Sequence, residues 1–197
     1  MIRSQAAILE AATTLFLRDG YVATTMDDIA EVAGVSKRTV YNNFADKEAL
    51  FREVVMGATS VAERFAAVAA AELADPDDLQ TALSTVARRL ALGATDARVV
   101  RLRRLLIGEA HRFPDLAAEY YRLAPGRIMA TLAGALSSLA VRGQLRVDDP
   151  SRAAEQLAFL ILGPALDRAM FEGPPSRRAL TRAADDGVRA FLAAYGR

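Results

Sequence analysis

Three residues suited to begin a helix follow one another at short intervals in the N-terminal part of the chain. Thr25, Ser36 and Asp46 each carry a side-chain oxygen that can accept a hydrogen bond from the amides of a first helical turn. Asp28 lies three residues after Thr25, where it can complete a reciprocal capping box. Gly34 is suited to end the first of these helices. The spacing predicts a helix-turn-helix within residues 24 to 44.

The segment before this corner predicts one longer helix that would pack against it. Gly20 is suited to the left-handed position that follows a helix, and Tyr21 would then pack against Phe16. The apolar residues of this segment recur at helical spacing and form one stripe: Ile8, Ala11, Ala12, Leu15 and Phe16.

The remainder of the chain shows helical, Ala-rich patterns without alternating strand-like runs. No Pro occurs in residues 1 to 75, and later prolines separate the helical patterns. The fold class is therefore expected to be all-α. The helix-turn-helix would lie in a domain over residues 1 to 46, followed by a larger helical domain over residues 47 to 197. One long helix is expected from Lys47 to about Ala74, followed by helices at 78 to 93, 96 to 111, 115 to 124, 126 to 142, 151 to 171 and 177 to 195, with a kink at Gly163-Pro164.

The second helix of the corner has one apolar face and one polar face. Val40 and Phe44 lie four residues apart and share a face, so the opposite face is centred near Asn42. Arg38 can bond guanine and Asn42 can bond adenine, while Thr39 can offer its hydroxyl or its methyl group. The residues better placed for phosphates are Thr24, Thr25, Lys37, Tyr41 and Lys47.

Bulk charge gives this interpretation no support. Residues 1 to 50 hold 5 basic and 7 acidic residues, a net charge of −2, and the whole chain carries +1. A polar surface turn between core helices is the alternative explanation of the segment, so the case for DNA rests on local placement.

The segment from Ala30 to Phe51, AEVAGVSKRTVYNNFADKEALF, resembles the TetR family of bacterial regulators. The resemblance extends upstream through Ile8 to Gly20 and covers about residues 6 to 52. It implies a three-helix DNA-binding domain, a fourth linking helix, and a C-terminal domain that dimerises and binds a small-molecule effector. It places the following residues at positions that commonly contact DNA: Thr25, Lys37, Thr39, Tyr41, Asn42 and Lys47.

The last two predicted helices are the candidates for dimerisation, because the family pairs through a four-helix bundle made from them. Two-fold pairing would also allow two half-sites about 34–36 Å apart to be read together. The alternative to dimerisation is that these two helices close the core of a single chain. The residues expected at the interface are Leu157, Leu160, Ile161, Ala165, Val188, Phe191, Leu192 and Tyr195.

The effector site is sought among large side chains of the C-terminal region, each of which could equally be ordinary core. A basic cluster at Arg98, Arg101, Arg103 and Arg104 is either a solvated face or a site for an anion. The candidates for ligand contact are Phe65, Leu102, Leu106, His111, Phe113, Tyr120, Tyr121, Met129 and Phe159.

Catalysis and metal binding find no support in the motifs. The chain has no Cys and one His, and no phosphate-binding, dinucleotide-binding or nucleophile-elbow motif occurs. The acidic doublets at 77–78, 148–149 and 185–186 are explained by helix capping. We expect neither an enzyme nor a bound cofactor or metal, and no signal peptide or membrane span, which predicts a cytoplasmic regulator. An architectural DNA-binding protein without an effector is the remaining alternative.

Overall fold

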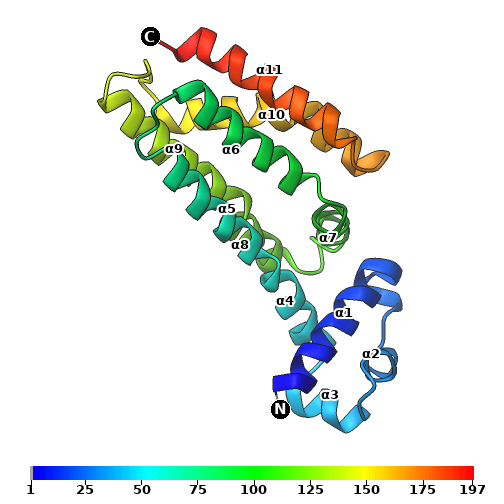
Figure 1. The fold of residues 1–197 in the computed structure, drawn as a ribbon. Coiled ribbons are helices and arrows are strands. Elements are labelled where there is room, and N and C mark those ends of the chain that lie inside the picture. Colours follow the sequence, from blue (N-terminus) through cyan, green and yellow to red (C-terminus); the bar gives the residue numbers. More distant parts are fainter. Residues whose placement is uncertain (1) are drawn as a thin grey trace. The chain divides into compact units, whose positions relative to one another are not determined.

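The computed structural model describes residues 2–197, with side chains from Ser4 onward. This part of the chain forms eleven α-helices and one isolated bridge between Leu145 and Gly196, which confirms the all-α class (Figure 1). Contacts divide the helices into two compact units. The first holds the residues up to Thr59 together with Arg101–Tyr120, and the second holds Ser60–Val100 and Tyr121–Arg197. This division by contacts differs from the expected boundary between residues 46 and 47.

The first unit is built around its N-terminal helix. Helix α1 (Ile2–Ala23) contacts α2 (Met26–Val32), α3 (Lys37–Asn43) and α4 (Lys47–Gly57). The unit also contains most of α7 (Ala97–Gly108) and the first turns of α8 (Pro114–Leu123). Its core is formed by side chains that are almost fully buried: Ile8, Leu15, Phe16, Ile29, Val40, Leu50 and Phe51.

The second unit is built around α10 (Pro150–Phe171). This helix packs against α6 (Leu79–Ala94), α9 (Pro125–Val141) and α11 (Arg177–Tyr195), and α6 also lies beside α11 (Figure 1). Helix α5 (Thr59–Glu72) completes the unit.

Helices α10 and α11 approach each other closely at a glycine. A Cβ atom added to Gly187 would lie 3.0 Å from the carbonyl oxygen of Leu160 and 3.2 Å from a side-chain carbon of Ile161. Helix α11 is also tied to α6, since the Arg88 guanidinium donates two hydrogen bonds to the Asp185 carboxylate, at 2.7 and 2.9 Å. The absence of a side chain at 187 therefore permits the backbones of α10 and α11 to meet.

Capping residues account for the starts of the later helices. Asp78, Asp149 and Ser176 accept hydrogen bonds from amides in the first turns of α6, α10 and α11, as the sequence predicts for two of the acidic doublets. The third doublet has another role, because Asp185 pairs with Arg88 and Asp186 pairs with Arg189.

One of the expected helices differs from those observed. The long helix expected from Lys47 to Ala74 is divided at Ala58 into α4 and α5. Helix α10 includes Pro164 within its bounds, and the kink expected at Gly163-Pro164 stays a prediction.

Two stretches are long and apolar enough to cross a membrane by length and composition alone, namely Lys47–Glu72 and Pro114–Val141. Each stretch is shared between two helices of the fold, α4 with α5 and α8 with α9. Each also contributes buried residues: Leu50 and Phe51 of the first stretch belong to the core of the first unit, and Leu132 and Leu136 of the second stretch belong to the core of the second unit. Only 28% of the first window and 22% of the second are buried within the fold.

Candidate nucleic-acid interface

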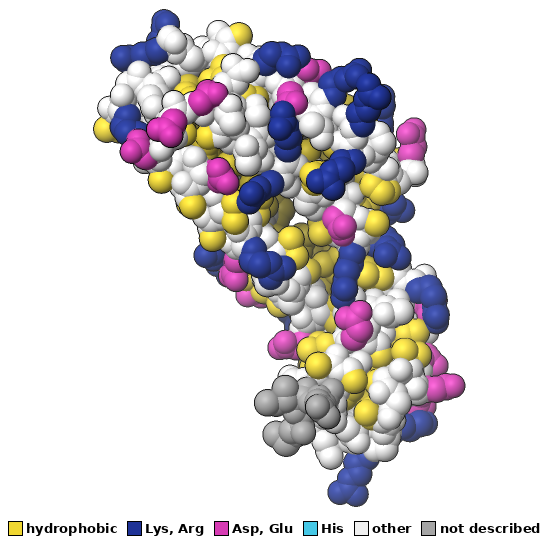
Figure 2. Space-filling view, in the orientation of Figure 1, with side chains coloured by type: hydrophobic (Ala, Val, Ile, Leu, Met, Phe, Trp, Pro, Cys, Tyr) yellow, Lys and Arg dark blue, Asp and Glu magenta, His cyan; other side chains and the backbone are white. Residues whose placement is uncertain are grey.

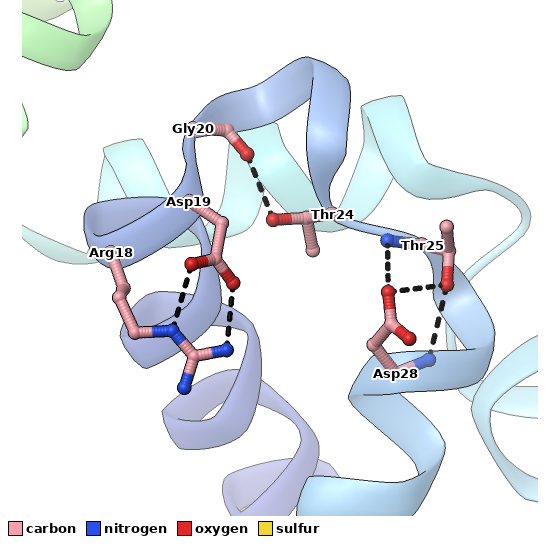
Figure 3. A network of polar contacts seen from close by, with 6 residues as sticks. All are labelled: Arg18, Asp19, Gly20, Thr24, Thr25 and Asp28. Atoms are coloured by element: carbon pink, nitrogen blue, oxygen red, sulfur yellow. Dashed lines mark hydrogen bonds and ion pairs between the residues drawn. The ribbon is translucent and has the colours of Figure 1, made fainter.

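The corner between α2 and α3 forms through local hydrogen bonds. The Thr25 hydroxyl oxygen accepts from the Asp28 amide at 3.1 Å, and the Asp28 carboxylate accepts from the Thr25 amide at 3.0 Å, which completes the predicted capping box (Figure 3). Gly34 adopts a φ of 65° in the turn, a left-handed value that favours glycine. The Ser36 hydroxyl then accepts from the Thr39 amide at 3.1 Å to begin α3. These contacts build a helix-turn-helix.

Helix α3 is held to the first unit by its apolar face. Val40 and Phe44 are buried, as their spacing predicts, and Ile29 of α2 is buried with them. The opposite face carries Arg38 and Asn42, which are both exposed.

Two further side chains complete the polar face of α3. Tyr41 is 54% exposed, and Thr39 is half-buried, with its hydroxyl 2.9 Å from that of Ser36. Among the described side chains, Arg38 forms no ion pair. The face therefore presents a guanidinium, an amide and a phenol, groups that hydrogen-bond to base edges and to phosphates.

Lys37 begins this face, and it is paired within the protein. Its Nζ donates to the Asp27 carboxylate of α2 at 2.6 Å, with side chains that are 66% and 56% exposed. The contact raises the pKa of Lys37, first through the hydrogen bond and then through the charge of Asp27. Both partners remain accessible to solvent.

Thr24 lies in a different environment from the one expected for a phosphate contact. It is 1% exposed, and its hydroxyl donates to the carbonyl oxygen of Gly20 at 2.8 Å (Figure 3). Gly20 has φ 84° and ψ 171°, so it interrupts α1 in an extended rather than a left-handed helical conformation, and one more helical turn follows. Thr24 thus stabilises the end of α1, with its hydroxyl facing the protein.

Lys47 is likewise engaged with the protein. Its Nζ donates to the carbonyl oxygens of Tyr21 at 3.0 Å and Thr24 at 2.8 Å, with a longer contact of 3.4 Å to that of Val22. The ammonium also lies 4.5 Å from the centre of the Tyr21 ring. A role in phosphate binding was expected, but in this conformation the donors of Lys47 join the start of α4 to the end of α1.

Replacing Lys47 with methionine should therefore destabilise the first unit. The change keeps the length of the side chain but leaves two half-buried carbonyl groups without a donor, and we expect the free energy of unfolding to fall by about 1–3 kcal/mol. Urea denaturation followed by circular dichroism measures this loss. Lys37→Met is the matched control, since the exposed pair that it removes contributes little to stability. Equal stability of both variants would contradict the joining role of Lys47.

An aromatic cluster surrounds this joint. The Tyr21 ring lies 5.9 Å from Phe16, 5.0 Å from Phe51 and 4.9 Å from Phe113 between ring centres. Burial is the main cause of the raised pKa of Tyr21. The contact of Tyr21 with Phe16 agrees with the sequence prediction. Phe113 was expected to contact a ligand, but its ring packs against Tyr21 and Phe51 in this cluster.

The other residues expected to contact a ligand are spread over both units. In the first unit, Leu102, Leu106 and Tyr120 are buried, while His111 is exposed. Burial raises the pKa of the Tyr120 phenol. In the second unit, Phe65 and Met129 are half-buried against the core, whereas Tyr121 and Phe159 are 64% and 72% exposed.

Half of the residues expected at a dimer interface lie inside one chain. Leu157, Ile161, Val188 and Phe191 are at most 2% exposed and belong to the core of the second unit. A second chain cannot contact side chains that their own chain already covers. Leu160 is 46% exposed, and the half-buried remainder comprises Ala165, Leu192 and Tyr195.

Leu160 was expected at a dimer interface and Phe159 at a ligand, but Phe171 was not among the expected residues and the three were not grouped as one exposed surface of α10. Phe159 is 72% and Phe171 is 87% exposed, and with Leu160 they form an apolar face on the outside of the second unit. Leu160 and Phe171 are 11 residues apart and share one side of the helix, and Phe159 lies about 100° further round it. The apolar stripe that contains Leu157 and Ile161 is more regular, but it is buried in the core of the second unit.

Two family models match the chain. Residues 8–54 match the bacterial regulatory proteins of the TetR family, and residues 81–197 match the C-terminal domain of AefR-like transcriptional repressors. A curated relative, the HTH-type transcriptional regulator YhgD of Bacillus subtilis, is 55% identical over 47 residues, which are 24% of this chain and 25% of YhgD. The match thus spans about a quarter of that relative.

Solved structures match over the whole length. A TetR-family transcriptional regulator from Mesorhizobium loti is 38% identical with a TM-score of 0.91, covering 100% of this chain and 98% of that one. The flavonoid-responsive regulator FrrA is 30% identical with a TM-score of 0.77, covering 100% and 98%. The capped helix-turn-helix, the all-α architecture and these matches lead to one conclusion. The chain belongs to the TetR family of DNA-binding transcriptional regulators.

Proposed function

We propose that this protein is a transcriptional repressor that binds a palindromic operator as a homodimer and is released by a small-molecule effector. The observation that carries the proposal is the exposed polar face of α3, with Arg38, Tyr41 and Asn42, on a helix whose opposite face is buried. A helix held in this way can enter a major groove and present its polar side chains to base edges.

The side chains of this face suit different parts of a duplex. Arg38 can donate two hydrogen bonds to guanine, and Asn42 can pair with adenine through its amide. Tyr41 and Lys37 lie on the flanks of the face, where a phenol and an ammonium suit phosphate oxygens. Thr39 can contact a thymine methyl group with its own methyl while its hydroxyl remains with Ser36. Thr24 and Lys47 are left out of this interface because their polar groups bind the protein's own backbone.

A second copy of the chain is the occupant that we propose for the apolar face of α10. Phe159, Leu160 and Phe171 expose large apolar surfaces that a single soluble domain normally covers. In a two-fold dimer the same patch of both copies meets, so each copy would cover the apolar side chains of the other.

Charge also suits this pairing. Glu155 and Asp167 are exposed on α10. Arg177, Arg178 and Arg182 line a shallow hollow along α11, where Figure 2 shows basic side chains gathered; Asp185 and Asp186 also line it, paired with Arg88 and Arg189. The acidic groups of α10 in one copy could therefore meet the basic groups of α11 in the other.

A small apolar or aromatic molecule is the class of effector that we propose. The relative FrrA is described as flavonoid-responsive. In this chain Leu102, Leu106 and Tyr120 offer buried apolar surface together with one neutral phenol. Effector binding would favour a dimer in which the two reading helices no longer match the spacing of the half-sites, so that operator affinity falls. The site of action would be the cytoplasm, where the DNA lies.

Selection of bound sequences from random duplexes tests this proposal. We expect the full-length chain to enrich an inverted repeat whose half-sites are centred about one helical turn, or a small multiple of it, apart. Its affinity for that repeat should fall steeply as salt rises. Enrichment of no sequence above the starting pool would overturn the proposal, and enrichment of a single half-site would overturn its dimeric part.

A further inference from the structure

The pair between Lys37 and Asp27 lies on the surface that we propose to face DNA. Lys37 is the first residue of α3 and Asp27 is the second residue of α2, so the pair bridges the two helices of the corner. The Nζ to Oδ2 distance of 2.6 Å is that of a charge-assisted hydrogen bond. The lysine that could reach a phosphate therefore already holds an anionic partner.

The neighbouring acidic residue is occupied elsewhere. The Asp28 carboxylate binds the amide and the hydroxyl of Thr25 in the capping box, at 3.0 and 2.6 Å. Asp27 takes no part in the cap, and its carboxylate is 56% exposed. It is therefore accessible to solvent and placed against the ammonium of Lys37.

The other described cations of the DNA-binding segment are largely engaged as well. Arg18 donates to the Asp19 carboxylate at 2.8 and 2.7 Å (Figure 3), and Lys47 donates to backbone carbonyls. Among the side chains described in residues 4–50, Arg38 is the cation that is held neither by an acidic side chain nor by backbone carbonyls. Release of Lys37 from Asp27 would thus double the number of cations that this surface can offer to phosphates.

We propose that Asp27 competes with the DNA backbone for Lys37 and thereby sets how tightly this protein binds its operator. The inference rests on the proposed function, because it concerns the same surface. An exposed pair of this kind shifts an equilibrium by about fivefold at most, so a phosphate can displace the carboxylate.

The competing interpretation is that Asp27 holds Lys37 in the orientation that a phosphate requires. The two roles predict opposite signs. If Asp27 competes for Lys37, its removal strengthens DNA binding, whereas if Asp27 positions Lys37, its removal weakens binding.

The test compares Asp27→Asn with Glu31→Gln. Each variant removes one negative charge from α2, but only Asp27 contacts Lys37, so Glu31→Gln measures the general effect of charge. Affinity is measured by fluorescence anisotropy on two duplexes, the selected operator and a 30-base-pair duplex of unrelated sequence. We expect Asp27→Asn to bind both duplexes about threefold more tightly than Glu31→Gln at low salt, with a smaller difference at high salt.

Repeating both substitutions in a Lys37→Met background isolates the pair. We expect the advantage of Asp27→Asn over Glu31→Gln to disappear in this background, because the ammonium for which Asp27 and a phosphate compete is absent. Equal affinities of the two single variants, weaker binding by Asp27→Asn, or an advantage that persists without Lys37 would each overturn the inference. Thermal unfolding of every variant verifies that the fold is retained.

A failure of the inference about Asp27 can be distinguished from a failure of the proposed repressor function. Phosphate contacts do not depend on sequence, so the duplex of unrelated sequence reports on Asp27 even if no operator is found. A failure to enrich any operator overturns the proposed function, whereas a cognate operator on which Asp27→Asn brings no gain overturns the inference alone.

Discussion

Replacing Arg38 with alanine is expected to weaken operator binding by roughly 5- to 150-fold, the range for loss of one good bidentate contact to a base. Arg38 is exposed on the face of α3 opposite the buried Val40 and forms no ion pair with any described side chain. Its guanidinium is therefore free to bind a base edge without first losing an internal partner. Because the side chain makes no core contact, thermal unfolding should be unchanged.

Arg18→Ala supplies the matched control for this prediction. It removes the same charge and the same side chain from the same unit, but Arg18 lies on α1 and is paired with Asp19. Anisotropy titrations should show affinity close to that of the unsubstituted chain. Specificity is a second measurement, since Arg38→Ala should relax the preference at one base pair of each half-site. Equal losses for the two variants would indicate a general effect of charge and contradict a base contact by Arg38.

The double substitution Phe159→Glu with Leu160→Glu is expected to convert a dimer into a monomer and to reduce operator affinity by about 100-fold or more. Both side chains project from α10 into solvent in the single chain, being 72% and 46% exposed, so the substitution should leave its core intact. In the proposed dimer the new carboxylates would be buried without partners. The helix-turn-helix domains of separate monomers would then lose the increase in affinity that comes from binding two half-sites together.

Sedimentation velocity at micromolar concentration measures the change in mass. Val141→Glu is the control, because Val141 is 87% exposed at the end of α9 and lies outside the apolar face of α10. That variant should sediment and bind DNA like the unsubstituted chain. If the double variant remains a dimer with full operator affinity, α10 does not provide the dimer interface.

Local signals in the sequence predicted the helix-turn-helix of α2 and α3 well. Thr25, Ser36 and Asp46 begin their helices as expected because a cap acts on amides two or three residues away. The burial of Val40 and Phe44 followed from their spacing on one helix. These features depend on near neighbours in the sequence, and the helix boundaries of the C-terminal region are predictable for the same reason.

Contacts between residues distant in the sequence explain what was not predicted. Lys47 binds carbonyl groups 23 to 26 residues earlier in the chain, and no local pattern reveals that partner. Phe113 packs on Tyr21 and Phe51, which are far from it in sequence. Periodicity shows that α11 has an apolar stripe with Val188 in it, but not whether the stripe faces the protein's own core or a second copy.

Because most described cations of the helix-turn-helix segment are paired within the protein, the time that the protein spends on DNA of unrelated sequence should be short. DNA of unrelated sequence attracts a protein almost entirely through phosphate contacts, and residues 1 to 50 carry only 5 basic against 7 acidic residues. We therefore expect the protein to leave random chromosomal DNA quickly and to spend little time sliding along it. Such a regulator would locate its operator mainly by repeated encounters from solution, and few copies would be held on the rest of the chromosome.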